Sequence, residues 1–94
     1  MGEPIPLDNN EIELACDLLW FVKLKGEWSP VDVALWERLQ PIRHGDFGGT
    51  AATDVSAEEA AAIVAAGDFT HPRVELDEDE DALVTRLRSL LAAQ

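Results

Sequence analysis

The chain has 94 residues, with 19 acidic and 7 basic side chains, which gives a formal net charge of −12 at pH 7. This charge argues against direct binding to nucleic acid or to an anionic membrane surface, because both ligands are themselves negative. A chain of this length forms one domain, residues 1–94, with a single core and too little interior for a deep substrate cavity. Its hydrophobic content, 47%, is typical of a folded globular protein.

The sequence lacks the features expected of a secreted or membrane protein. Its single cysteine, Cys16, cannot form an internal disulfide bond, and the N-terminal sequence MGEPIPLDNN lacks the basic region and apolar run of a signal peptide. Uninterrupted apolar runs such as Leu18–Val22 are much shorter than the roughly 20 residues that span a bilayer. We therefore expect a cytoplasmic protein.

Four segments begin with the same pattern, in which a Ser or Asp is followed three positions later by an acidic residue. A helix start leaves backbone N–H groups without partners, and the first side chain of such a pair accepts from one of them. The acid three residues on reaches back to the N–H of the cap. In chain order, the four pairs are Asp8–Glu11, Ser29–Asp32, Ser56–Glu59 and Asp77–Glu80.

The first predicted helix, residues 9–25, has a wide apolar face that suits the centre of a bundle. Lys23, Lys25 and Gly26 form a typical C-terminal signature. The segment from Trp20 to Trp28 also alternates like a strand, with Lys25-Gly26 as a hairpin turn. Helix is favoured, although periodicity alone does not decide so short a run.

The second predicted helix, residues 30–43, has Pro30 at its first position, where the missing N–H is tolerated. A glycine-rich loop containing His44 and Asp46 follows it. The third helix, residues 57–66, consists mostly of alanine, and Gly67 is predicted to end it.

The last part of the chain contains a proline and then a further helical stripe. The residue before Pro72 avoids helix, which favours a short extended segment over Arg73–Leu76. The fourth helix is predicted over residues 78–93. The fold class is therefore all-α, a small bundle of about four helices. Its predicted core consists of Ile12, Cys16, Leu19, Leu35, Leu39, Ile63, Leu83, Leu87 and Leu90.

No candidate for catalysis, cofactor binding or metal binding matches a known pattern. The glycine-rich loop has no phosphate-binding motif, and His44, Asp46 and His71 do not have the spacing of a metal site. Cys16 lies on the apolar stripe of the first helix without a nearby base. We expect a non-enzymatic protein without cofactors.

The alternating acids from Asp77 to Asp81 are similar to the start of a calcium-binding loop. Such a loop requires glycine at its sixth position and glutamate at its twelfth. Ala82 and Arg88 occupy those positions here, so the segment is better interpreted as a charged helix start.

The acidity is concentrated in the C-terminal half, because residues 51–94 carry a net charge of −7. Helix capping accounts for about half of the acids. We predict that the acidic C-terminal half provides a partner-binding surface, and that apolar residues left over on the first helix contribute to it. The predicted binding residues are Glu75, Asp77, Glu78, Asp79, Glu80, Asp81, Trp20 and Phe21.

Three functions fit these features. The preferred one is a regulator or inhibitor that binds a protein with a basic patch through its acidic surface and a helix face. An alternative is a nucleic-acid mimic of the phage inhibitor type, which requires the acids to gather on one face. A third is an obligate subunit or homodimer that uses Trp20 or Phe21. An acidic, salt-adapted proteome would explain the charge without any partner.

Overall fold

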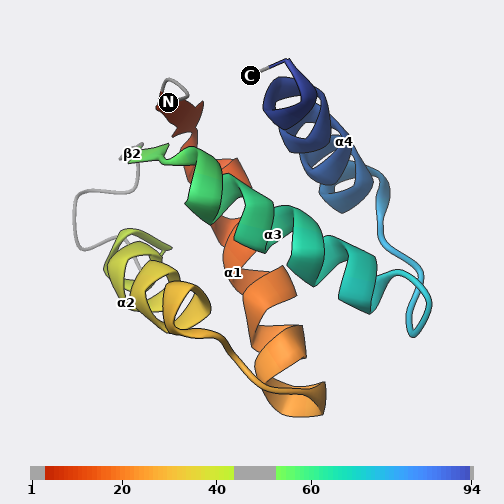
Figure 1. Ribbon diagram of the computed structural model, residues 1–94. Coiled ribbons are helices and arrows are strands. Elements are labelled where there is room, and N and C mark those ends of the chain that lie inside the picture. The colour runs from red at the N-terminus through yellow and green to blue at the C-terminus, as the bar shows by residue number, and fades with distance from the viewer. Residues whose placement is uncertain (1–3, 44–52, 94) are drawn as a thin grey trace.

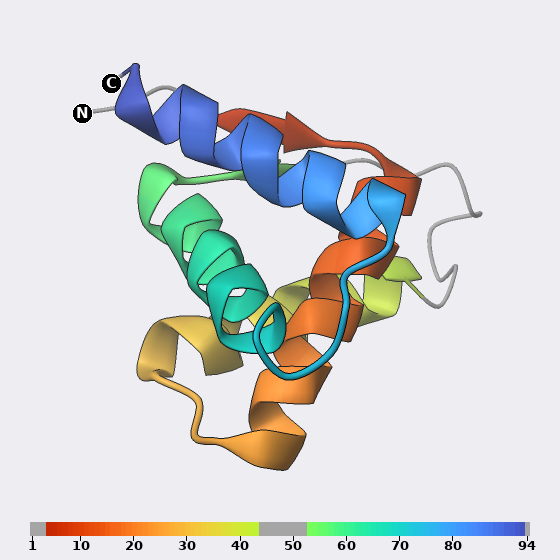
Figure 2. The same cartoon turned by 90° about the vertical axis from the view of Figure 1, so that its right-hand side faces the viewer.

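The computed structural model describes residues 4–43 and 53–93. Within these ranges the chain forms four helices, which confirms the predicted fold class, and two short strands. Helix α1 contacts each of the other helices and lies between them (Figures 1 and 2). In chain order, the elements are β1 (Ile5–Leu7), α1 (Asn9–Lys25), α2 (Pro30–Arg43), β2 (Thr53–Val55), α3 (Ala57–Thr70) and α4 (Glu78–Ala92).

All four helices begin at the residue that follows the predicted cap. At the first start, the Asp8 N–H donates to the Glu11 carboxylate at 3.1 Å, and the Glu11 N–H donates to the Asp8 carboxylate at 2.8 Å. The same reciprocal pair opens α2 and α3. At α4, the Asp77 N–H donates to the Glu80 carboxylate at 3.3 Å. These acids therefore stabilise helix ends whose N–H groups lack backbone acceptors.

The segment from Trp20 onward is helical up to Lys25, as favoured over the strand alternative. The Gly26 N–H donates to the Val22 carbonyl at 2.7 Å and closes the last turn of α1. The chain then reverses within a short irregular connection before α2 begins at Pro30.

Helix α3 is longer than predicted, because Gly67 does not end it. Gly67 is buried against α4, and a Cβ added to it would lie 2.5 Å from Cγ2 of Val84. The glycine therefore serves the close approach of two helices. The helix ends at Thr70, whose hydroxyl donates to the Ala66 carbonyl at 2.8 Å.

The two strands are not predicted by the sequence analysis. They pair antiparallel, with Ile5 opposite Val55 and Leu7 opposite Thr53. Their apolar side chains point into the core, so the sheet covers the end of the bundle at which α1 and α3 begin. Arg73–Leu76 forms a turn followed by an irregular connection rather than a strand.

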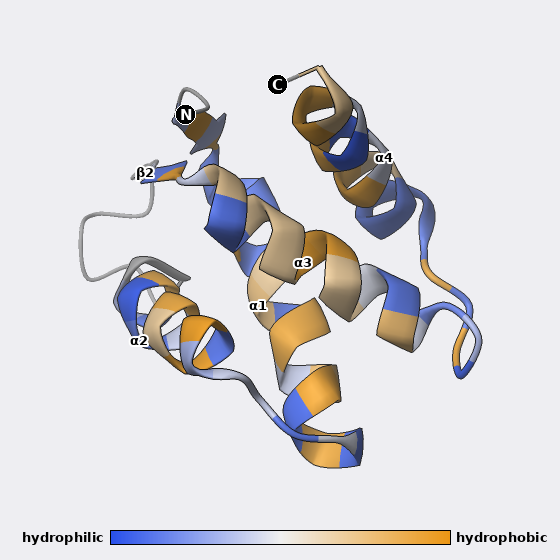
Figure 3. Ribbon diagram, in the orientation of Figure 1, coloured by the Kyte–Doolittle hydropathy of each residue, from blue (hydrophilic) through white to orange (hydrophobic). Residues whose placement is uncertain are grey.

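The core is centred on α1 and contains eight of the nine predicted residues. The prediction is wrong for Leu90, which is 37% exposed. In α4 the buried stripe is centred between Leu87 and Val84, and Leu90 falls at its edge. Apolar residues extend along α1 to its C-terminal end, whereas the first turn of α4 is hydrophilic (Figure 3). The residues that α1 buries are Ile12, Ala15, Cys16, Leu18, Leu19 and Val22.

Replacement of Leu87 by Ala should destabilise the protein by about 2–5 kcal/mol, because it leaves a cavity in a fully buried region. The matched control is Leu90→Ala, at the exposed edge of the same helix, which should cost less than about 1 kcal/mol. Urea denaturation monitored by circular dichroism measures both. Similar losses for the two variants would place the core boundary elsewhere.

Replacement of Gly67 by Ala should also destabilise the protein, although the same change at an exposed helix position stabilises by about 1 kcal/mol. The added methyl group meets Val84, and such overpacking costs roughly 1–3 kcal/mol. In a Val84→Ala background the clash is absent, so Gly67→Ala should become neutral or stabilising there. Thermal melts of the four proteins test this. An equal loss in both backgrounds would rule out the clash.

Candidate functional site

Three tryptophans form one cluster where α1 turns into α2. The ring of Trp36, in α2, lies 5.4 Å from that of Trp20 and 5.4 Å from that of Trp28, measured between centroids. The rings of Trp20 and Trp36 are stacked, with planes 24° apart. Aromatic pairs of this kind contribute about 0.5–1.5 kcal/mol beyond the burial of area, so the cluster stabilises the corner between the two helices.

Trp28 is held in place by two further contacts. Its indole N–H donates to the Leu19 carbonyl of α1 at 2.7 Å. The ammonium group of Lys23 lies 5.5 Å from the centroid of its ring, within the range of a cation–π interaction. The base of the cluster is therefore fixed to α1.

The outer side of the cluster is exposed. Trp20 is 45% exposed, and Leu24, one turn further along α1, is 60% exposed. Val33, 38% exposed, lies one turn before Trp36 in α2. Among the described residues, these are three of the five exposed large apolar side chains. Helical spacing places Leu24 beside Trp20 and Val33 beside Trp36, and exposed apolar patches are typical of interaction sites. We call the following five residues the aromatic face: Trp20, Leu24, Trp28, Val33 and Trp36.

The sequence analysis identified Trp20 but missed the other two tryptophans. The sequence does contain a signal for this cluster, which is the even spacing of the tryptophans. Trp28 lies in the connection between the helices, and Trp20 and Trp36 are each eight residues away from it. When a chain reverses between two helices, positions equally distant from the turn come close together.

Phe21, predicted to act with Trp20, lies on another side of α1. Its ring makes an edge contact with Phe69 of α3, with centroids 6.1 Å apart. The guanidinium group of Arg73 lies 3.9 Å from the centroid of the Phe69 ring. Phe21 is partly buried in this contact between helices, so the structure does not bring it together with Trp20.

The predicted acidic residues of Glu75–Asp81, which we call the acidic segment, lie on the surface at the start of α4. All of them are exposed except Glu80, which is partly buried. Within the described part of the chain, none of them forms an ion pair with Lys or Arg. The charge of this segment therefore faces solvent without a neutralising partner.

Those arginines whose side chains the structure describes are engaged elsewhere. Arg38 of α2 pairs with Glu59 of α3 at 2.9 Å. Arg88 of α4 pairs with Asp68 of α3. These ion pairs join neighbouring helices at the surface, where each contributes little stability, but they reduce the positive charge available to balance the acidic segment.

Asp79 of the acidic segment lines a pocket with Asn10 and Leu14 of α1. The next residue, Glu80, is partly buried. Its pKa is raised above the ordinary value of 4.5, mainly by burial and further by the charges of Asp77 and Asp17, while a hydrogen bond from the Asp77 backbone opposes the shift. Asp17 belongs to α1 and precedes Trp20 by three residues. The acidic segment is thus close to Asp17 of α1, and Asp17 is one turn from Trp20 of the aromatic face.

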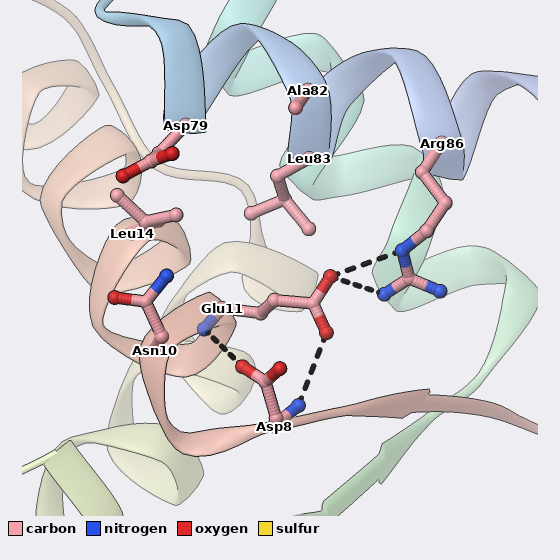
Figure 4. Close-up of a pocket in the computed structure, with 8 residues that line it drawn as sticks. All are labelled: Asp8, Asn10, Glu11, Leu14, Asp79, Ala82, Leu83 and Arg86. Carbon is pink, nitrogen blue, oxygen red and sulfur yellow. Dashed lines mark hydrogen bonds and ion pairs between the residues drawn. The ribbon is translucent and has the colours of Figure 1, made fainter.

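A small pocket lies between α1 and α4 (Figure 4). Arg86 donates to one oxygen of Glu11 at 2.6 and 3.0 Å, and to the Pro6 carbonyl at 3.2 Å. Glu11 and Arg86 satisfy each other, and the volume of about 210 Å³ is below that of usual ligand sites. We interpret this contact as a structural link between helices. The pocket is lined by Asp8, Asn10, Glu11, Leu14, Asp79, Ala82, Leu83 and Arg86.

The remaining sequence candidates do not form a chemical site in the described residues. Cys16 is completely buried, and no three His, Cys, Asp or Glu side chains of the described ranges are arranged to hold a metal ion. His44, Asp46 and the glycine-rich loop lie outside the described residues. In the described ranges, no helix is both long and apolar enough to span a membrane.

Comparison with protein-family models, with curated proteins and with solved structures finds no match for this chain. The function is therefore argued from the geometry of the two neighbouring surfaces.

Replacement of Glu80 by Gln should stabilise the protein at pH 7. Because the folded state raises the pKa of Glu80, its ionised form is less favourable in the folded than in the unfolded chain. The resulting loss of folding stability is absent below pH 4.5. It appears as the pH rises through the pKa that Glu80 has in the folded state. Gln also retains the capping function. Thermal melts between pH 3 and pH 7 should therefore show an advantage that disappears in acid.

The matched control for this prediction is Glu78→Gln, which removes the same charge from the exposed first turn of α4. It should lower stability slightly at pH 7, because an acid near a helix start interacts favourably with the backbone dipole. A gain of equal size in both variants would indicate a general charge effect instead.

Proposed function

We propose that this protein is a non-enzymatic cytoplasmic regulator or inhibitor that binds another protein through the aromatic face and the acidic segment. The observation that carries the proposal is their closeness along α1, since Asp79 lines a pocket with Leu14, and the exposed Trp20 lies less than two turns further along the same helix. In protein interfaces, a few aromatic anchors supply most of the affinity. Charges around them mainly accelerate encounter and select the partner.

The chemistry of the partner follows from the sign of this surface. The acidic segment has no ion pair among the described residues, and the net charge of the chain is −12. A partner with a basic patch next to an apolar one is complementary to both parts. Association should slow as salt increases, because ions screen charges beyond about 8 Å at physiological ionic strength.

The distribution of the other acids supports docking over mimicry of nucleic acid. Helices α1 and α3 begin beside the two paired strands, whereas α2 begins at the opposite end of α1 (Figure 1). The acidic helix starts thus lie at both ends of the bundle. A duplex mimic needs its charges along one face.

Replacement of Asp77, Asp79 and Asp81 by Asn tests the proposal, because Asn also caps helix starts while three charges are removed. Proteins from a host lysate are captured on the immobilised wild-type chain. The association rate of each purified captured protein is then measured at several salt concentrations. We expect the triple variant to associate several-fold more slowly and with a weaker salt dependence.

The matched control removes three exposed acids outside the acidic segment, with the changes Glu27→Gln, Asp54→Asn and Glu58→Gln. This variant should associate nearly as fast as the wild type. The proposal is wrong if the variant of the acidic segment folds normally and binds with unchanged rate and salt dependence.

A further inference from the structure

The solvent side of α1 has two chemically different halves. Glu13, Asp17, Trp20 and Leu24 are all exposed and follow one another at intervals of four, three and four residues. This spacing places them in one line along a helix. The first half of the line is acidic, and the second half is apolar.

Neighbouring elements widen each half. The acidic segment adjoins the first half, because Asp79 lines a pocket together with Asn10 and Leu14 of α1. Trp36 and Val33 of α2 adjoin the second half, because the ring of Trp36 stacks on that of Trp20. Helical spacing and the stack of Trp20 on Trp36 thus place an acidic end and an aromatic end along one side of α1. From Glu13 to Leu24 this surface extends about 16 Å along the helix axis, or three helical turns.

Building on the proposed function, we propose that this surface binds an amphipathic basic helix of the partner protein. Apolar residues of that helix, one turn apart, contact Trp20, Leu24 and Val33. Its Lys and Arg residues face Glu13 and the acidic segment. Recognition of an amphipathic helix by an apolar surface uses anchors at such intervals, and three turns supply two or three of them.

The net negative charge of the chain favours a basic helix over a second copy of the chain as the ligand of this surface. Each copy carries a net charge of −12, so two copies repel each other at long range. A basic helix is attracted by the same field. It also provides apolar contacts for side chains that are exposed in this structure.

The experiment uses the full chain and a synthetic helical peptide of about 18 residues, with leucines on one face and lysines on the other. Isothermal titration should detect binding of this peptide, and much weaker binding of a scrambled peptide with the same composition. Leu24→Gln and Trp20→Ala should each weaken the affinity by about tenfold or more, the effect typical of anchor residues. Leu24 is 60% exposed, so its replacement tests the surface without disturbing the core.

The matched control is Leu90→Gln, which removes an exposed leucine from the distant end of α4 and should leave the affinity unchanged. Equal affinities for the two peptides, or equal effects of Leu24→Gln and Leu90→Gln, would overturn the inference. So would a micromolar dimer in sedimentation that Leu24→Gln dissociates, because the occupant would then be a second copy.

Binding of the captured partner to the variants distinguishes this inference from the proposed function. If both the triple Asn variant and Leu24→Gln weaken its binding, but the amphipathic peptide binds no better than the scrambled one, the proposed function stands and the helix-binding surface is wrong. If neither variant alters its binding, both proposals fail.

Discussion

The burial of α1 on most of its circumference is the constraint on which the rest of the structure depends. Its six buried residues supply a third of the buried apolar positions of the core among the described residues. The other helices each cover a different part of it, which leaves the line from Glu13 to Leu24 exposed, together with Asn10, Lys23 and Lys25 near its ends. Because a chain of this size can form only one core, that exposed line is the place where surface chemistry and the central helix coincide.

The acidic residues have two separate roles in this arrangement. Those at the helix starts satisfy backbone N–H groups and interact favourably with the helix dipole. In α4 the cap and the acids that follow it exceed what capping requires, and Glu80 carries a raised pKa because it is partly buried near like charges. The acids that cap the start of α4 thus also leave an unbalanced negative charge on the surface where α4 meets α1.

The sequence predicted most of the features that depend on local chemistry. The capping pairs located every helix start, and the apolar stripe of α1 located most of the core. The meaning of Gly67 was missed, because it depends on Val84, a partner brought in by tertiary structure. The strands were missed because three residues are too few for a recognisable alternation.

The candidate site was predicted in part, for related reasons. The acidic segment and Trp20 are exposed and adjacent, but Phe21 faces α3 because consecutive residues of a helix point about 100° apart. Trp28 and Trp36 join the surface only through the geometry of the turn between α1 and α2. No period within either helix contains that information.

Glu11 takes part both in the cap of α1 and in the contact between α1 and α4. One oxygen of its carboxylate accepts from the cap of α1, and the other accepts from Arg86, 75 residues later in the sequence. As the chain is synthesised, the cap can orient this carboxylate before α4 exists. The arginine then meets an acceptor whose rotamer freedom is already lost, so less entropy opposes the docking of the last helix. The first turn of α1 thus orients the acceptor to which the last helix binds.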